Sequence, residues 1–280
     1  MKTNYQIRHA AHPQDVKNYD TARLREHFLI EKLFAADEVN MVYSLYDRLI
    51  VGGAMPVKEK LELENIDPLK APFFLHRREL GIVNVGGPGT ITVDGTAYEL
   101  AYKDALYVGK GDRKVVFASK DAAKPAHFYF NSAPAHMTYP DKKIGEKDRI
   151  VIELGAPETC NHRMLNKLIV NEILPTCQLQ MGMTTLLNGS VWNTMPPHTH
   201  DRRMEAYFYF EVPHDQAVCH FMGEVKETRH IWMHNEQAVI SPVWSIHSAA
   251  ATASYTFIWG MGGENLDYDD KDNCLPTDLM

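Results

Sequence analysis

The feature that most constrains the fold of this chain is a regular rhythm of short strand-like runs separated by turns that contain glycine and proline. Turn signals include Gly-Gly-Pro-Gly at residues 86–89 and Asp-Gly at residues 94–95. In the first half, runs rich in Val, Ile, Tyr and Phe occur at residues 39–46, 48–55, 81–85, 90–93, 105–108, 114–118 and 127–131. Short strands at this spacing favour a β-sandwich or barrel. We therefore expect an all-β fold with a few short helices.

The second half shows the same rhythm after a change of texture. Residues 134–175, with their prolines and charged stretches, predict the connection between two domains. We expect an N-terminal barrel over residues 1–140 and a C-terminal barrel over residues 141–280. The likeness of the two halves has two explanations, a duplication or a chance similarity between two all-β halves. Strand-like runs resume at residues 178–187, 205–212, 217–222, 229–234, 238–241 and 255–260.

One early segment has the pattern of a helix rather than a strand. Asp20 or Thr21 can cap its start, and Leu24 and Phe28 lie one turn apart on the same face. We expect this helix to be one of the few in the fold.

Composition and charge exclude several classes of protein. The 280 residues are 45% hydrophobic and 23% charged, which is typical of a water-soluble globular chain. A formal net charge of −7 argues against binding to nucleic acid, which needs clustered Lys and Arg. The N-terminal residues show no pattern of a secretory signal. The apolar stretch at residues 238–263 contains polar residues, glycine and proline, so it is not expected to span a membrane. The four cysteines form no C-x-x-C pair. We therefore expect a cytoplasmic protein with neither a nucleic-acid nor a membrane partner.

The sequence Pro-Pro-His-Thr-His at residues 196–200 predicts a metal site. On an extended strand, side chains at i and i+2 point to the same face, so His198 and His200 can bind one metal. Glu205 follows at an odd spacing, so residues 201–204 must turn before a new strand begins at Glu205. A pair of histidines spaced by two is common in surface strands, so the pair alone does not establish the site.

The strand that begins at Glu205 supplies two different faces. Glu205, Tyr207 and Tyr209 share one face, which we place in the barrel lumen with the metal. His247, which follows a strand later in the chain, completes a set of three imidazoles and one carboxylate. Such a set suits Zn, Fe, Mn, Ni or Co, and the donors alone do not choose among them. The opposite face packs against another barrel or subunit and holds Ala206, Phe208 and Phe210.

Other polar and aromatic residues are interpreted mainly as surface charges, packing residues or hydrogen-bonding residues of the fold. Arg202 and Arg203 are either solvated turn charges or the group that binds a substrate carboxylate, which guanidinium groups do bidentately. Trp192, Trp232 and Trp244 are assigned to packing rather than to stacking on a sugar. The remaining histidines are assigned to hydrogen bonding within the fold, and they include His76, His127, His136, His230 and His234.

The metal motif, H-x-H followed by x4-Glu and a distant His, resembles that of cupins, whose fold is a double-stranded β-helix barrel. A resemblance to the 5-keto-4-deoxyuronate isomerase family covers nearly the whole chain. It rests on runs that occur in order: Met-Val-Tyr-Ser (41–44), Asp-Arg-Leu-Ile-Val-Gly-Gly (47–53), Arg-Arg-Glu-Leu-Gly (77–81), Asp-Ala-Leu-Tyr-Val-Gly-Lys-Gly (104–111), Ala-Pro-Ala-His (133–136), Trp-Asn-Thr-Met-Pro (192–196) and His-Asn-Glu-Gln-Ala (234–238).

This resemblance implies a bicupin fold of two jelly-roll barrels. It also implies that the chain forms a homo-oligomer, namely a hexamer. It implies one Zn²⁺ per subunit on the second barrel, held by His198, His200, Glu205 and His247, and a first barrel without this ligand set. It also implies the interconversion of 5-dehydro-4-deoxy-D-glucuronate and 3-deoxy-D-glycero-2,5-hexodiulosonate in the breakdown of pectin and related uronate polymers.

The residues leave the chemistry partly open. An aldose–ketose shift by proton transfer needs a general base near the migrating proton, and Tyr207, Glu236 and an unbound histidine are candidates. A hydride shift would need no such base. An iron-dependent cupin dioxygenase and a non-catalytic sugar-binding cupin with a structural metal are the alternatives to an isomerase.

Overall fold

The fold of this chain, given by a computed structural model, is built mainly from β-strands, as predicted, and its residues group into two compact units. The structure describes residues 2–264 and 270–280. Unit 1 comprises Met1–Arg8, Lys32–Arg149 and Leu168–Met181. Unit 2 comprises His9–Glu31, Ile150–Lys167 and Gly182–Met280. None of the helices in the described part of the chain is long and apolar enough to cross a membrane.

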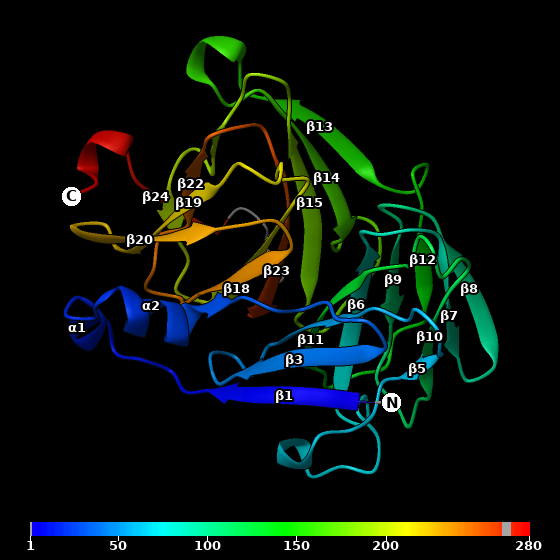
Figure 1. The fold of residues 1–280 in the computed structure, drawn as a ribbon. Helices are drawn as coiled ribbons and strands as arrows, with labels where there is room; N and C mark the ends of the chain where they lie inside the picture. Colours follow the sequence, from blue (N-terminus) through cyan, green and yellow to red (C-terminus); the bar gives the residue numbers. More distant parts are fainter. Residues whose placement is uncertain (1, 265–269) are drawn as a thin grey trace. The chain divides into compact units, whose positions relative to one another are not determined.

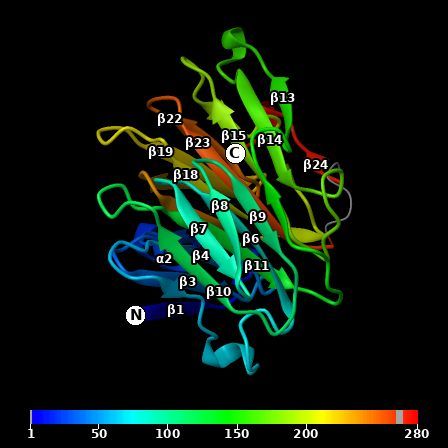
Figure 2. The same cartoon turned by 90° about the vertical axis from the view of Figure 1, so that its right-hand side faces the viewer.

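Unit 1 contains two sheets, with strands of both labelled in Figures 1 and 2, and the buried residues of the two sheets form one hydrophobic cluster. The seven-stranded sheet has the order β1 (Lys2–Arg8), β3 (Glu38–Ser44), β4 (Ile50–Ala54), β11 (Phe128–Pro134), β6 (Arg78–Asn84), β9 (Ala105–Val108) and β12 (Lys142–Ile144). The four-stranded sheet has the order β5 (Leu61–Glu62), β10 (Val115–Ser119), β7 (Gly89–Val93) and β8 (Thr96–Leu100). A single 3-10 turn, η1, spans Asp67–Leu69.

Unit 2 has the same plan with a small addition. Its seven-stranded sheet has the order β13 (Ile150–Leu154), β14 (Arg163–Ile169), β15 (Gln180–Leu186), β23 (Thr256–Gly263), β18 (Arg203–Phe210), β21 (Gln237–Ser241) and β2 (Leu29–Ile30). Its four-stranded sheet has the order β16 (Trp192–Asn193), β22 (Ser248–Ala251), β19 (Val218–Glu224) and β20 (Glu227–Met233). The addition is a two-stranded sheet of β17 (His198–Thr199) and β24 (Asp272–Asn273), and two 3-10 turns are η2 (Pro157–Thr159) and η3 (Pro276–Asp278).

The predicted helix is present as α2 (Thr21–Phe28), preceded by the short α1 (Pro13–Val16). The side chain of Asp20 caps α2 by accepting a hydrogen bond from the Arg23 backbone N–H at 2.8 Å. Leu24 and Phe28 are buried on one face of the helix, as expected. Both helices belong to unit 2, although they lie near the N-terminus in sequence.

The strand order is the same in the two units. The run β4-β11-β6-β9 in unit 1 matches β15-β23-β18-β21 in unit 2, and β10-β7-β8 matches β22-β19-β20. This agreement supports duplication over chance similarity. The predicted connection at residues 134–175 also carries β12, β13 and β14. Those strands escaped prediction because polar residues interrupt their apolar pattern, and β13 is partly or fully exposed along its length.

The register explains why unit 1 has a hydrophobic core where unit 2 has polar groups. Glu205 on β18 pairs with Met261 and Ser241 in the two neighbouring strands. Leu80 holds the corresponding position on β6, opposite Ser132 and Val108. Leu80 is fully buried in the hydrophobic cluster of unit 1. A leucine therefore occupies the place of the one predicted carboxylate ligand.

Candidate metal centre

His198 lies on a two-residue strand, β17, which ends at Thr199 directly before His200. His198 begins β17 and pairs with Asn273 of β24, so the C-terminal segment fixes the first ligand. The predicted turn is present but shorter than expected. Residues 201–202 make the turn, closed by a backbone hydrogen bond from Arg203 N to His200 O at 3.4 Å, and β18 already begins at Arg203.

Glu205 lies on β18 with its side chain on the face that we assigned to the barrel interior. Tyr207, two residues on, shares this face, and its ring centroid lies 5.3 Å from that of His247. Tyr209 continues the same face and donates or accepts a 2.8 Å hydrogen bond between its hydroxyl and Nδ1 of His220. His247 stands between β21 and β22, directly before Ser248.

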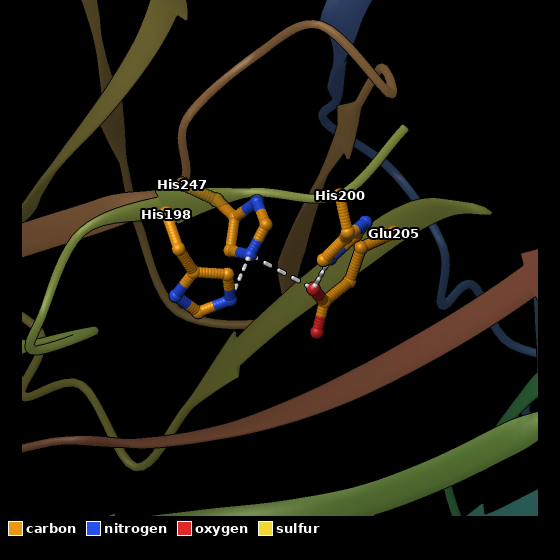
Figure 3. Close-up of side chains that lie close together, drawn as sticks. All are labelled: His198, His200, Glu205 and His247. Carbon is orange, nitrogen blue, oxygen red and sulfur yellow. Dashed lines mark hydrogen bonds and ion pairs between the residues drawn. The ribbon is translucent and has the colours of Figure 1, made fainter. Parts of the chain in front are cut away.

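The four predicted ligands come together in unit 2 and point toward one another (Figure 3). One ligand atom from each of His198, His200, Glu205 and His247 lies within 4.8 Å of all the others. The closest pairs are 3.0 Å apart: Nε2 of His247 with Nε2 of His198, and Oε2 of Glu205 with Nε2 of both His200 and His247. All four side chains are buried. Among residues 2–264 and 270–280, this is the one such group of three or more His, Cys, Asp or Glu side chains.

Hydrogen bonds on the far side of each imidazole orient the Nε2 atoms. Nδ1 of His198 lies 3.0 Å from the Pro196 carbonyl oxygen, and Nδ1 of His200 lies 2.7 Å from that of Arg203. A carbonyl only accepts, so both Nδ1 atoms donate to these oxygens, and both Nε2 atoms face the other members of the cluster. The Ser241 hydroxyl lies 3.2 Å from Nδ1 of His247. Such outer contacts are typical of metal-binding histidines.

The protonation states of the cluster favour a bound cation. Burial lowers the pKa of His198 to about 3, and the neighbouring His247 adds to this effect. Burial also lowers the pKa of His247. Burial acts to raise the pKa of Glu205, but His247 and His200 outweigh it and hold this pKa well below its usual range. Together the cluster offers three imidazoles and one carboxylate, a set of donors that fits a divalent metal such as Zn²⁺.

The ligands open onto a cavity of about 330 Å³ that lies within unit 2. His198, His200 and Glu205 form part of its wall. The cavity combines an apolar side with positive charge, which is an arrangement suited to a small anionic ligand. Its apolar side includes Phe257, Trp259 and Met261, and its cationic residues are Arg163, Lys167, Arg203 and Lys271.

Comparison with known proteins places this site in a family. The KduI/IolB family model matches residues 28–274. The chain belongs to the KduI/IolB family. Over 279 residues it is 69% identical to a 4-deoxy-L-threo-5-hexosulose-uronate ketol-isomerase of Bacteroides fragilis (strain YCH46), with 100% of both chains covered. It is 68% identical over 279 residues to 4-deoxy-L-threo-5-hexosulose-uronate ketol-isomerase 1 of Bacteroides thetaiotaomicron, again with 100% of both covered.

A solved structure supports the fold of this KduI/IolB family member. The crystal structure of an IolB-like protein from Salmonella typhimurium LT2 matches with a TM-score of 0.69. It covers 89% of this chain and 97% of its own, at 12% sequence identity. Identity this low carries the fold and nothing about activity.

Arg202 and Arg203 differ from each other in the structure. Arg203 lines the cavity but is only 1% exposed, and its guanidinium is paired with Asp270. Arg202 lies outside the cavity lining and pairs with Glu264 at 3.2 Å and with Asp270 at 3.7 Å. Arg203 is thus neutralised within the fold, and Arg202 stands apart from the cavity.

The sequence interpretation missed three cations that line the cavity. Arg163 and Lys167 are four positions apart on β14, so they share one face of that strand, together with Leu165. Lys271 comes from the segment that leads into β24. The alternation Arg-x-Leu-x-Lys was visible in the sequence, but β14 lies in the stretch that was predicted to be a connection.

The structure also shows which candidates for the proton-transferring group line the cavity. Tyr207 lines the cavity, and its hydroxyl lies 2.6 Å from Oγ1 of Thr194, which lines it too. Glu236 lies between β20 and β21 and is not part of the lining. His220 is fully buried behind Tyr209, and within the described residues its Nε2 atom has no hydrogen-bond partner. Among the tryptophans, Trp259 lines the cavity, whereas Trp232 is 47% exposed.

Proposed function

We propose that this chain is a metal-dependent aldose–ketose isomerase that interconverts 5-dehydro-4-deoxy-D-glucuronate and 3-deoxy-D-glycero-2,5-hexodiulosonate during the breakdown of pectin and related uronate polymers. The observation that carries the proposal is the buried group of three imidazoles and one carboxylate, His198, His200, His247 and Glu205, at the wall of a cationic cavity. Full-length relatives at 68–69% identity that are named ketol-isomerases supply the reaction.

We assign one Zn²⁺ per chain to this group, because neutral imidazole nitrogens and a carboxylate oxygen are ligands that zinc accepts. A bound zinc ion supplies Lewis-acid polarisation of a carbonyl oxygen and stabilises negative charge on it. The protein holds the ligands ready, since the Nδ1 contacts of the three histidines fix their ring orientations.

The cavity also offers groups for the acidic end of the substrate. Arg163, Lys167 and Lys271 bring positive charge to its wall, and we assign the substrate carboxylate to this cationic side. Phe257 and Trp259 provide an apolar surface against the carbon skeleton of the sugar. This arrangement selects a sugar acid over a neutral sugar because only the acid neutralises the cations.

Tyr207 and Thr194 are the hydroxyl groups that we assign to the reacting hydroxyls of the substrate. Their 2.6 Å hydrogen bond fixes the Tyr207 hydroxyl at the cavity wall, two residues along β18 from Glu205. The reaction route is tested by running the isomerisation in deuterium oxide. Deuterium in the product indicates proton transfer through an exchangeable group, and its absence indicates a hydride shift.

The direct test is conversion of 4-deoxy-L-threo-5-hexosulose-uronate by the purified, metal-loaded chain, followed by NMR. We expect conversion by the wild type and its loss in Glu205→Gln. Glu236→Gln is a matched control, because it makes the same carboxylate-to-amide change outside the cavity lining, and it should keep activity. Oxygen consumption without isomerisation would favour a dioxygenase, and ligand binding without turnover would favour a binding protein.

We also infer that the chain is a cytoplasmic homo-oligomer, a hexamer, on the basis of its family resemblance. Native mass spectrometry of the purified protein tests the stoichiometry directly. A monomer under conditions in which the isomerase is active would rule out the oligomer as a requirement for function.

A further inference from the structure

Unit 1 has a cavity of its own, of about 270 Å³, to which the proposed isomerase reaction gives no role. Three arginines line it, Arg48, Arg77 and Arg78, together with the aromatic rings of Tyr43 and Phe74. None of the described residues that line it is acidic. The cavity is therefore a concentration of positive charge with an apolar wall.

Arg78 is the buried member of the three and is only 4% exposed. Its Nε donates to the Ser132 hydroxyl at 3.0 Å, and its Nη2 donates to the backbone carbonyls of Arg48 and Ser132, each at 2.6 Å. All three acceptors are neutral. Nη1 makes no hydrogen bond to any residue that the structure describes. Burial lowers the pKa of Arg78 to about 10, so the group is still charged at neutral pH.

The adjacent carboxylate does not serve Arg78 as an ion-pair partner. Glu79 is the next residue on β6, so its side chain points to the opposite face of the sheet. Its carboxylate accepts hydrogen bonds from the Tyr107 hydroxyl at 2.7 Å and from three backbone N–H groups, those of Cys177, Gln178 and Leu179, at 2.7 to 2.9 Å. Glu79 is thus saturated by donors on its own side.

The corresponding arginine of unit 2 shows what Arg78 lacks. Arg203 begins β18 opposite Gly263 of β23, as Arg78 begins β6 opposite Pro134 of β11. Arg203 is also buried, but its guanidinium is paired with Asp270. A buried cation is costly without a hydrogen-bonded negative partner, and none of the described residues of unit 1 places a carboxylate against the Arg78 guanidinium, so the equivalent place calls for one from a ligand.

The other two arginines extend the same site toward the surface. Nη2 of Arg77 is held by the carbonyls of Leu69 and Lys70 at 2.7 and 3.0 Å, which leaves its remaining N–H groups for a ligand. The Arg48 guanidinium is exposed and makes no hydrogen bond or ion pair with the described part of the chain. Tyr43 lies beside Arg78, whose Cζ is 5.8 Å from the centre of the tyrosine ring.

We propose that this cavity is a second binding site, specific for the carboxylate of a small sugar acid, with Nη1 of Arg78 and the guanidinium of Arg48 as its anion-binding groups. The volume of about 270 Å³ is just below the range of about 300–1,000 Å³ for ligand sites, so the ligand is no larger than about a single sugar ring. The tyrosine and phenylalanine rings suit the apolar face of such a ring.

The test is isothermal titration calorimetry of the full-length, metal-loaded protein with D-galacturonate, and with D-galactose as the neutral control. We expect galacturonate to bind at least about tenfold more tightly than galactose, because a charge-assisted hydrogen bond is lost with the neutral sugar. Arg48→Gln and Arg78→Lys should each weaken galacturonate binding by about tenfold or more. Lys124→Gln, the same charge change at an exposed site outside the cavity, should leave it unchanged.

Two further measurements keep the result interpretable. Arg48→Gln should retain isomerase activity, which would show that this variant is folded. The binding measured with Arg48→Gln therefore tests the proposed site even if Arg78→Lys does not fold. Binding that depends on Arg48 should persist in His247→Ala, which disrupts only the metal centre. The proposal is overturned if galacturonate gives no heat at about 10 mM, if Arg48→Gln binds as tightly as the wild type, or if His247→Ala alone abolishes binding.

Discussion

Each ligand histidine is positioned by what its Nδ1 atom contacts, and the sequence shows only part of this. The spacing of His198 and His200 predicts that they share a face, and the structure confirms it. The carbonyl oxygens of Pro196 and Arg203, which fix the two rings, follow from the local turn and could not be read from residue types. Lys271 was missed for a related reason, because nothing in its local sequence indicates that it lines the cavity.

Tyr207 is expected to contribute to turnover and not to metal binding. Tyr207→Phe removes the hydroxyl that bonds to Thr194 at 2.6 Å but keeps the ring that packs near His247. We expect kcat to fall by about tenfold or more, in line with the loss of one directed hydrogen bond. Zinc content per chain, measured on the same preparation, should be unchanged, and loss of zinc would place Tyr207 in the metal site instead.

His220 should make the metal-free protein sensitive to acid. Burial lowers its pKa to about 3, with a smaller effect of His247, whereas in the unfolded chain it titrates near about 6.5. Between these values the unfolded chain binds the proton and the folded chain does not, so the free energy of unfolding decreases as pH falls below about 6.5. At pH 5 the loss is about 2 kcal/mol from this residue.

Urea unfolding of the metal-free wild type and of His220→Gln, at pH 7 and pH 5, checks this expectation. The ligand histidines are present in both proteins, so the difference in pH dependence reports the contribution of His220 together with its interaction with His247. The variant should lose about 2 kcal/mol less than the wild type between the two pH values. An identical loss in both proteins would show that His220 is protonated as readily in the folded state as in the unfolded state.

At the level of elements, strands with alternating or continuous apolar runs were predicted well, and those without were not. The strands β4, β9 and β18 overlap their predicted positions because they are rich in Val, Ile, Leu and aromatic residues. Asp272–Asn273 has no strand propensity, yet it forms β24 against His198. A pairing between residues 75 positions apart is set by tertiary structure, which local patterns do not contain.

The segment that leads into β24 should stabilise the metal centre through Asp270. Asp270→Asn leaves the buried guanidinium of Arg203 without its carboxylate, and we expect the free energy of unfolding to fall by about 3 kcal/mol. Zinc affinity should fall as well, because the Arg203 carbonyl orients His200. Chemical unfolding and chelator competition measure the two effects.

Glu264→Gln is the matched control for that substitution. Glu264 pairs with Arg202, and both of these side chains are largely exposed, so the change should cost less than about 1 kcal/mol. Equal effects of the two substitutions would contradict a special role for the buried ion pair.

For the molecule as a whole, the two units share one strand order but differ in the residue that stands at the position of the candidate carboxylate ligand. The same plan places Glu205 in unit 2 and Leu80 in unit 1 at matching register positions. The ligand spacing and the all-β class were readable from the sequence. The sequence did not predict that residues 9–31 belong to unit 2, because this depends on the pairing of β2 with β21, about 210 positions later in the chain.

The central claim is that the four-residue cluster of unit 2 holds a metal that isomerisation requires. The most direct measurement is metal analysis of the purified chain joined to an isomerase assay before metal removal, after it, and after return of zinc. We expect one zinc per wild-type chain, loss of turnover with the metal, recovery when zinc is restored, and neither zinc nor turnover in His247→Ala. Full turnover by a chain verified to be free of metal would contradict the claim.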